Sequence, residues 1–276
     1  MPERVADRYA AWVDAPGEPA TARPAATVML VRDAPGFGAA PPRAGVPGAG
    51  GVEVFVQVRV ASMAFAPNRV VFPGGGVDAA DGADLPWAGP APSEWATRLG
   101  TTAEHARGLV AAAIRELFEE CGVLLAGPDG HTVLGPVPQE LHTARDRVAR
   151  REVTLAETLR EHGLVARTDL LGYAAHWITP EVEPRRYDTR FFAALLPSGQ
   201  VADGETSEAE RAEWARPADL LRDVAGGLMP PTRVCLERLA EHPSAASVVG
   251  ARDAVATVTP RPVRAGDGWA MRAEWA

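Results

Sequence analysis

The chain has 276 residues, 46% of them hydrophobic and 23% charged, which is typical of a globular protein with one large domain or two small ones. Its 28 lysines and arginines are outnumbered by 36 aspartates and glutamates, so the formal charge is −8. This acidic balance argues against a surface for duplex nucleic acid or an anionic membrane.

Residues 1–24 form an N-terminal segment that has no long apolar run and carries acids, so it resembles neither a secretory signal nor a membrane anchor. The only cysteines, Cys121 and Cys235, do not make a disulfide framework. Because Cys121 falls on the apolar face of a predicted helix, we expect reduced thiols and a cytoplasmic protein.

The first predicted strands are β-branched runs at residues 26–33 and 52–61, the second with regular alternation. Between them, residues 34–51 are rich in Gly, Pro and Ala and are interpreted as a long loop. The stretch "NRVVFPGGGVDAAD" then predicts a short strand that leads into three glycines, Gly74, Gly75 and Gly76. Glycines without a Cβ allow the backbone to approach a ligand closely.

A segment rich in Pro and Ala follows at about residues 82–100, and after it the sequence predicts a helix at about residues 102–121. Thr101 and Glu104 have the spacing of a capping box, and Gly122 is the residue type favoured just beyond a helix end. Apolar residues cluster on one side of this helix, which predicts that this side is buried.

The same helix carries Glu116, Glu119 and Glu120, which fall within an arc of roughly 100° because residues three and four apart share a helix face. One interpretation is a solvated face on which Arg115 pairs with Glu119 four residues later. The other is a site for a divalent cation, since Mg²⁺ binds carboxylates together with substrate phosphates.

The rest of the chain alternates between predicted helices and strands in a mixed α/β order, which favours one domain with a central mixed sheet between helices. The predicted domain spans residues 25–243, and residues 244–276 are expected to form an extended tail. The further elements are a helix at 144–164, strands within 170–180 and 185–197, helices within 217–227 and 230–242, and extended segments at 253–264 and 268–275.

Together, "PGGGVDAAD" and "RELFEECGV" resemble the two halves of the Nudix box, which is Gly, five residues, Glu, seven residues, then Arg-Glu-aliphatic-x-Glu-Glu-x-Gly-aliphatic. The second half matches at every specified position, namely Arg115, Glu116, Leu117, Glu119, Glu120, Gly122 and Val123. In the first half Asp81 stands where Glu is expected, and 33 residues, 82–114, replace the usual seven.

The resemblance extends over residues 27–242 and implies the Nudix fold, an α/β/α sandwich with a central mixed sheet. It also implies that Glu116, Glu119 and Glu120 bind Mg²⁺ or Mn²⁺, that Arg115 orients a box glutamate, and that Gly74, Gly75 and Gly76 shape the loop for the diphosphate. Asp81 is a candidate for a further ligand or base, or an ordinary turn aspartate.

Residues outside the box are candidates for the same site. Glu205 and Glu208 precede the last core helix, where the family often recruits a further acid as ligand or general base, although a solvated acidic loop is the alternative. Arg185, Arg186 and Arg190 could recognise phosphate through their guanidinium forks, or only solubilise an edge strand. Trp214 is expected to pack in the core.

The interrupted box, "FPGG", "RRYDTRFF" and "PPT" resemble a Nudix branch that includes peroxisomal coenzyme A diphosphatases. The resemblance implies a metal-dependent hydrolase for coenzyme A or acyl-coenzyme A. Against this substrate, Ala64 and Asn68 stand where other coenzyme A Nudix enzymes have an arginine and a glycine.

Two alternatives stay open, a diphosphatase for ADP-ribose, a dinucleotide or a nucleotide sugar, and a Nudix domain that senses a nucleotide without cleaving it. The expected partner is a small-molecule nucleotide, and exposed terminal strands could pair two copies into a homodimer. The insert at 82–100 carries Trp87 and Trp95, and we expect it to cover the cleft and help select the substrate.

Overall fold

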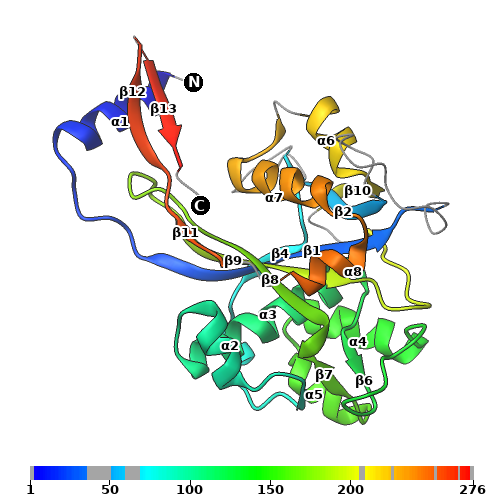
Figure 1. Cartoon of the computed structure of the whole chain (residues 1–276). Coiled ribbons are helices and arrows are strands. Elements are labelled where there is room, and N and C mark those ends of the chain that lie inside the picture. The colour runs from blue at the N-terminus through cyan, green and yellow to red at the C-terminus, as the bar shows by residue number, and fades with distance from the viewer. Residues whose placement is uncertain are drawn as a thin grey trace.

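A mixed β-sheet runs through the middle of the molecule, with helices packed on both of its faces (Figure 1). The computed structural model describes residues 3–35, 51–59, 69–204, 209–224, 227–251, 254–266 and 268–273. Its helices are α1 (Glu3–Asp14), α2 (Pro92–Leu99), α3 (Ala103–Cys121), α4 (Gln139–Ala149), α5 (Leu155–Glu161), α6 (Pro217–Asp223), α7 (Pro230–Glu241) and α8 (Ala245–Gly250), with short 3₁₀ helices at Ala79–Gly82 and Thr168–Leu170.

The main sheet has the strand order β10-β2-β1-β9-β8-β11, with β3 paired to β2 and β4 paired to β1. Strand β1 pairs in parallel with β9 and antiparallel with β2, so the predicted mixed sheet is confirmed. The strands are β1 (Ala22–Asp33), β2 (Val52–Arg59), β3 (Val70–Val71), β4 (Gly74–Gly76), β5 (Trp87–Ala88), β6 (Ala126–Gly127), β7 (Val165–Arg167), β8 (Leu171–Ile178), β9 (Arg186–Leu195), β10 (Ala209–Ala215), β11 (Thr257–Val258), β12 (Arg261–Ala265) and β13 (Gly268–Arg272).

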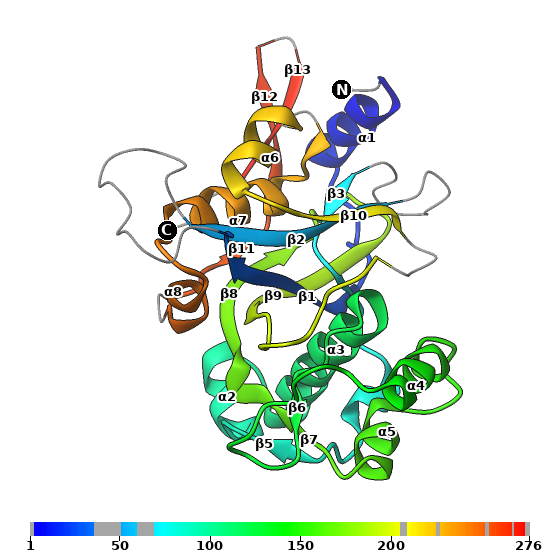
Figure 2. The same ribbon diagram turned by 90° about the vertical axis from the view of Figure 1, so that its right-hand side faces the viewer.

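Alternation along β1 divides the buried residues between two cores. Val28 and Leu30 face the core that contains α3, whereas Met29 and Val31 face the core that contains α7. Figure 2 shows α2, α3, α4 and α5 on one side of the sheet and α6 and α7 on the other. This is the α/β/α sandwich that the sequence predicts.

Helix α3 begins one residue later than expected. The Thr102 hydroxyl, not that of Thr101, accepts a hydrogen bond from the backbone N–H of His105 at 3.2 Å. The helix ends as predicted, because Gly122 adopts a left-handed conformation with φ of 68° and its N–H donates to the carbonyl of Phe118. Cys121, the last helical residue, is buried with a free thiol, as is Cys235.

The single helix expected at residues 144–164 is two helices, α4 and α5, so that prediction was wrong. The chain breaks at Arg151, which has φ of 60°, and Thr154 and Glu157 then form a capping box that begins α5. No glycine or proline marks this break in the sequence.

The insert at residues 82–100 is folded into the core. It supplies β5 and α2, and α2 places Trp95 fully buried against Phe192 in an edge-to-face contact with ring centroids 5.9 Å apart. Trp214 packs edge-on against Phe55 at 5.4 Å, which confirms its expected packing role. The loop expected at 34–51 falls mainly on residues 36–50, which lie outside the described ranges.

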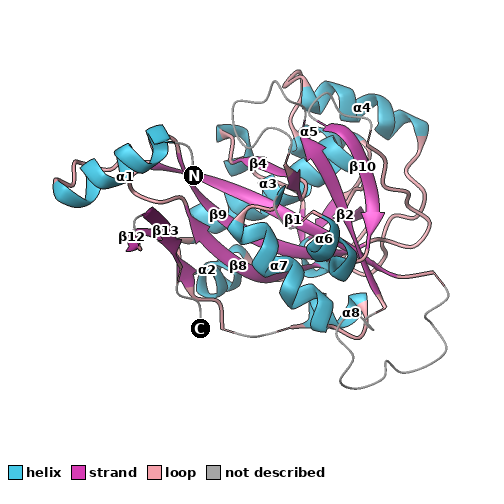
Figure 3. Ribbon diagram, turned by 90° about the horizontal axis from the view of Figure 1, so that it is seen from above, coloured by secondary structure: helices cyan, strands magenta, loops and turns pink. Residues whose placement is uncertain are grey.

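The expected extended tail begins instead with helix α8, whose Ala245 and Val248 are buried in the α7 core. After α8, strand β11 pairs with β8, and β12 and β13 form a hairpin. Seen from above, this hairpin and α1 lie at the same end of the molecule (Figure 3). Within the described residues, no helix combines the length and apolar character needed to cross a membrane.

Candidate active site

A cleft of about 1120 Å³ lies beside α3, on the α7 side of the sheet. Part of its wall is polar and comes from α3 and from β4, the strand of three glycines. Much of the remaining wall is apolar and includes Phe72, Trp177, Phe191, Met229 and Met271. The cleft therefore combines carboxylates with a large apolar surface, as ligand pockets commonly do.

Glu116, Glu119 and Glu120 all line this cleft. Glu116 and Glu120 are buried, with 6% of each residue exposed. All three acids therefore line one cleft, which argues against a solvated helix face.

The glycines of β4 allow the strand to lie directly against α3. A Cβ at Gly75 would stand 2.4 Å from Oε1 of Glu116, and one at Gly74 would stand 2.5 Å from the carbonyl oxygen of Ala26. The Gly74 N–H also donates a hydrogen bond to Oε2 of Glu120 at 3.1 Å. Glycine is thus required at position 75 for the close approach of β4 to the box helix, and at position 74 for its close approach to β1.

Arg115 fixes the geometry of the acids. One amino group donates to Oε1 of Glu116 at 2.7 Å and to Oε1 of Glu119 at 3.2 Å, and the other donates to the carbonyl oxygen of Gly76 at 2.9 Å. Burial opposes the charge of Arg115, but its hydrogen bond with Asp81 and the neighbouring carboxylates outweigh burial and raise its pKa. The predicted pairing of Arg115 with Glu119 is confirmed.

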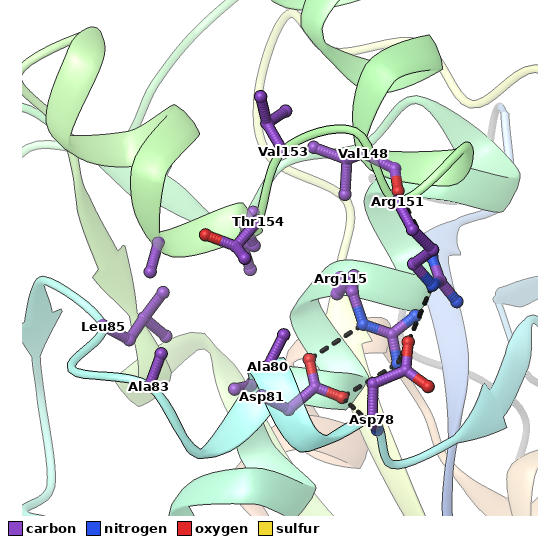
Figure 4. A pocket seen from close by; sticks show the side chains of 13 residues that line it. Asp78, Ala80, Asp81, Ala83, Leu85, Arg115, Val148, Arg151, Val153 and Thr154 are labelled. Carbon is purple, nitrogen blue, oxygen red and sulfur yellow. Dashed lines mark hydrogen bonds and ion pairs between the residues drawn. The ribbon is translucent and has the colours of Figure 1, made fainter.

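Asp81 supports Arg115 from the side away from the cleft. Its two oxygens accept hydrogen bonds from Arg115 at 2.8 and 2.9 Å, and Oδ2 also accepts the N–H of Asp78 at 2.8 Å (Figure 4). Asp81 is buried and lines a smaller cavity of about 70 Å³, not the large cleft. This arrangement suits a residue that positions Arg115 more than a metal ligand or a general base.

Burial dominates the electrostatics of Glu116. Removal from water raises its pKa to about 7, although the guanidinium of Arg115 acts in the opposite direction. A positive charge placed in the cleft would relieve the cost of ionising this buried carboxyl.

Three carboxylates from one helix line the cleft, and carboxylate oxygens are the ligands that hard divalent cations prefer. In this conformation their oxygens are not gathered at one point. Within the residues that the structure describes, no three His, Cys, Asp or Glu side chains are grouped closely enough to hold a metal ion. Oxygens of Glu116 and Glu119 accept hydrogen bonds from arginines instead. Metal binding by these acids stays a prediction.

The three arginines around β9 do not act together. Tyr187, Thr189 and Phe191 line the cleft, so the residues between them point to the opposite face of the sheet. Arg186 donates to the carbonyl oxygens of Thr179 and Ala20, and buried Arg190 contacts Asp188 and His176 on the α3 side.

Only Arg185, just before β9, lines the cleft, and it is exposed there. The prediction that Arg186 and Arg190 share this site was wrong, because strand alternation directs them away from it. The insert at 82–100 also contributes no residue to the cleft wall, so its expected role as a cover is not supported. Glu205, Glu208, Ala64 and Asn68 lie outside the described residues.

Three charged groups that sequence reasoning missed line the cleft, namely Asp78, Arg151 and Glu183. Glu183 lines it and accepts hydrogen bonds from Arg8 and Tyr9 of α1. Arg151, in the loop between α4 and α5, also lines it and contacts Glu119. Pro180 and Pro184 near Glu183 are a weak sequence indication of a loop with a fixed conformation. Arg151 stands in a run of charged residues, and nothing in that run indicates a site.

Comparison with known proteins places the chain in a family. The model of the NUDT19 Nudix domain matches residues 96–233. The acyl-coenzyme A diphosphatase NUDT19 of Xenopus laevis is 24% identical over 225 residues, which cover 68% of this chain and 59% of the relative. The putative nudix hydrolase 7 of Caenorhabditis elegans is 29% identical over 191 residues, which cover 68% and 56%. The chain therefore spans between half and two thirds of the length of these relatives.

The fold also matches a solved structure. The NUDIX hydrolase from Alicyclobacillus acidocaldarius superposes with a TM-score of 0.66 over 85% of this chain and 98% of that chain, at 24% identity. The family match covers half of the chain and includes the whole of α3. The chain belongs to the Nudix hydrolase family, whose members generally use divalent metal ions.

Proposed function

We propose that the chain is a metal-dependent diphosphatase that cleaves the diphosphate bond of coenzyme A or acyl-coenzyme A. The supporting observation is that three box glutamates and a large apolar wall line the same cleft. Carboxylates suit the diphosphate end of such a substrate through a bridging cation, and an apolar wall suits its pantetheine arm and acyl chain.

The contacts of each residue indicate its role in this reaction. Glu116, Glu119 and Glu120 would hold Mg²⁺ or Mn²⁺, which when bound neutralises the diphosphate and lowers the pKa of water for attack at phosphorus. Arg115 keeps Glu116 and Glu119 turned toward each other. The N–H of Gly74 orients Glu120 by its hydrogen bond to Oε2.

The apolar wall favours coenzyme A over more polar nucleotides. An acyl chain would pack against the partly exposed Met229 and Met271 of this wall, whereas ADP-ribose and nucleotide sugars carry no comparable apolar group. Relatives named acyl-coenzyme A diphosphatases agree with this choice.

A substrate panel tests the proposal. The purified chain would be incubated with Mg²⁺ or Mn²⁺ and coenzyme A, an acyl-coenzyme A, ADP-ribose, NADH or a nucleotide sugar, and the products would be identified by mass spectrometry. We expect adenosine 3′,5′-bisphosphate with 4′-phosphopantetheine or its acyl form. A higher kcat/KM for ADP-ribose or NADH would overturn the substrate, and tight binding without turnover of any compound would indicate a nucleotide sensor.

A further inference from the structure

Arg151 adopts a backbone conformation that is unfavourable for its residue type. It has φ of 60°, and within the described ranges it is the only residue other than glycine with a positive φ. Glycine would adopt this conformation without the steric cost of a Cβ. A residue held in such a conformation at a cleft indicates that its side chain has a role there.

The side chain of Arg151 extends from the α4–α5 loop into the acidic end of the cleft. Its amino group donates to Oε1 of Glu119 at 2.6 Å. Its Nε lies 2.7 Å from Oδ2 of Asp78, and Figure 4 shows these two side chains facing each other. Oε1 of Glu119 is also the oxygen that Arg115 contacts. Two guanidinium groups therefore converge on one carboxylate oxygen of the box helix.

The two arginines differ in how freely they can leave Glu119. The side chain of Arg115 is only 4% exposed and is bonded on all sides, whereas that of Arg151 is 50% exposed. Because half of the Arg151 side chain is in water, its ion pair with Glu119 is weak enough to exchange for another partner. Arg151 can therefore swing away while Arg115 stays in place.

We propose that Arg151 occupies Glu119 in place of a divalent cation and, once a cation binds there, turns to the diphosphate of the substrate. This inference rests on the proposed function. A planar guanidinium fork matches the paired oxygens of a diphosphate, and the α4–α5 loop already holds it at the cleft. One side chain would then favour metal release from the empty enzyme and substrate binding by the loaded enzyme.

The test uses Arg151→Gln and Arg151→Gly, with Arg150→Gln as the matched control. Glycine relieves the backbone conformation, so the second variant keeps the loop folded. Arg150 is the neighbouring arginine, is 62% exposed, pairs with Glu152 and does not line the cleft. Mn²⁺ affinity would be measured without substrate by electron paramagnetic resonance, and kcat/KM would be measured on coenzyme A.

Both Arg151 variants should bind Mn²⁺ roughly 3- to 10-fold more tightly, because a competing positive charge has been removed. Their kcat/KM should nevertheless fall roughly 10- to 100-fold, mainly through KM, because a charge-assisted contact to the diphosphate is lost. Arg150→Gln should match the wild type in both measurements.

Unchanged Mn²⁺ affinity or unchanged kcat/KM in the Arg151 variants of an active enzyme would overturn the inference alone. Absence of Mn²⁺ binding and of turnover in the wild type would overturn the proposed function as well. Retained or increased melting temperature in Arg151→Gly would show that the kinetic loss does not come from unfolding.

Discussion

Glu119 is held from two sides, by Arg115 in a buried region and by Arg151 in an exposed one. Around Arg115, the guanidinium is enclosed by Asp81, Glu116 and the carbonyl of Gly76, and almost none of it is exposed. Around Arg151, the guanidinium is half exposed and contacts Asp78 and Glu119 from a loop. The buried Arg115 fixes the positions of the carboxylates. The exposed Arg151 can give up its contact with Glu119 to another positive charge.

The contrast between Arg115 and Arg151 matters for function only if Glu116, Glu119 and Glu120 bind a metal ion. Glu120→Gln should lower kcat roughly 10²- to 10⁴-fold, because an amide cannot replace a carboxylate on a divalent cation and that cation supplies several kcal/mol of stabilisation. The helix should remain intact, as judged by circular dichroism and melting temperature.

Glu104→Gln is the control for this change, since Glu104 lies on the same helix but is exposed and outside the cleft. Excess EDTA should abolish wild-type turnover. Full activity in EDTA, or wild-type rates in Glu120→Gln, would contradict metal binding at α3.

The insert at 82–100 is part of the hydrophobic core, contrary to its expected role as a cover for the cleft. Trp95→Ala should lower the free energy of unfolding by about 3–5 kcal/mol, because a fully buried aromatic side chain is removed beside Phe192. KM should stay near the wild-type value, since no insert residue lines the cleft. Chemical denaturation measures the change in the free energy of unfolding, and steady-state kinetics measures KM. A large rise in KM with unchanged stability would restore the insert as a cover for the cleft.

Paired carboxylate changes compare the two regions directly. Asp81→Asn should lower the free energy of unfolding by about 2–4 kcal/mol, because it leaves a buried guanidinium with a neutral partner. Asp78→Asn should cost less than about 1 kcal/mol, because the side chains of Arg151 and Asp78 are 50% and 39% exposed, which weakens their ion pair. Urea unfolding of both variants checks the difference. Equal costs would show that the two regions are not distinct.

A smaller effect concerns the rim of the cleft. If Arg185 binds the 3′-phosphate of coenzyme A, dephospho-coenzyme A should lose roughly 10- to 150-fold in kcat/KM, the value of one charge-assisted hydrogen bond. Arg185→Ala should erase that discrimination, whereas Arg222→Ala, at an exposed position of α6, should preserve it. Steady-state kinetics with both substrates give the answer. Equal rates for the two substrates with the wild type would exclude recognition of the 3′-phosphate.

The box helix could be predicted from sequence because its signals are local. Helical periodicity, a capping threonine and Gly122 define its ends, and spacing alone brings Glu116, Glu119 and Glu120 to one face. The glycines at 74–76, upstream of the interruption, then completed the resemblance to a Nudix box.

The remaining parts of the site depend on long-range packing. The side of the sheet reached by Arg186 and Arg190 depends on how β9 pairs with β1, which strand composition does not reveal. The break at Arg151 lacks a glycine or proline, so local propensity favoured one helix. The Pro and Ala content of the insert concealed that Trp95 fills the core beneath it.

The most direct test of the central claim is anomalous diffraction from crystals grown with Mn²⁺. The account predicts an anomalous peak roughly 2.0–2.3 Å from carboxylate oxygens of Glu116, Glu119 and Glu120, with the guanidinium of Arg151 moved away from Glu119. No peak at these carboxylates under saturating Mn²⁺, or a peak elsewhere while Arg151 still contacts Glu119, would contradict it.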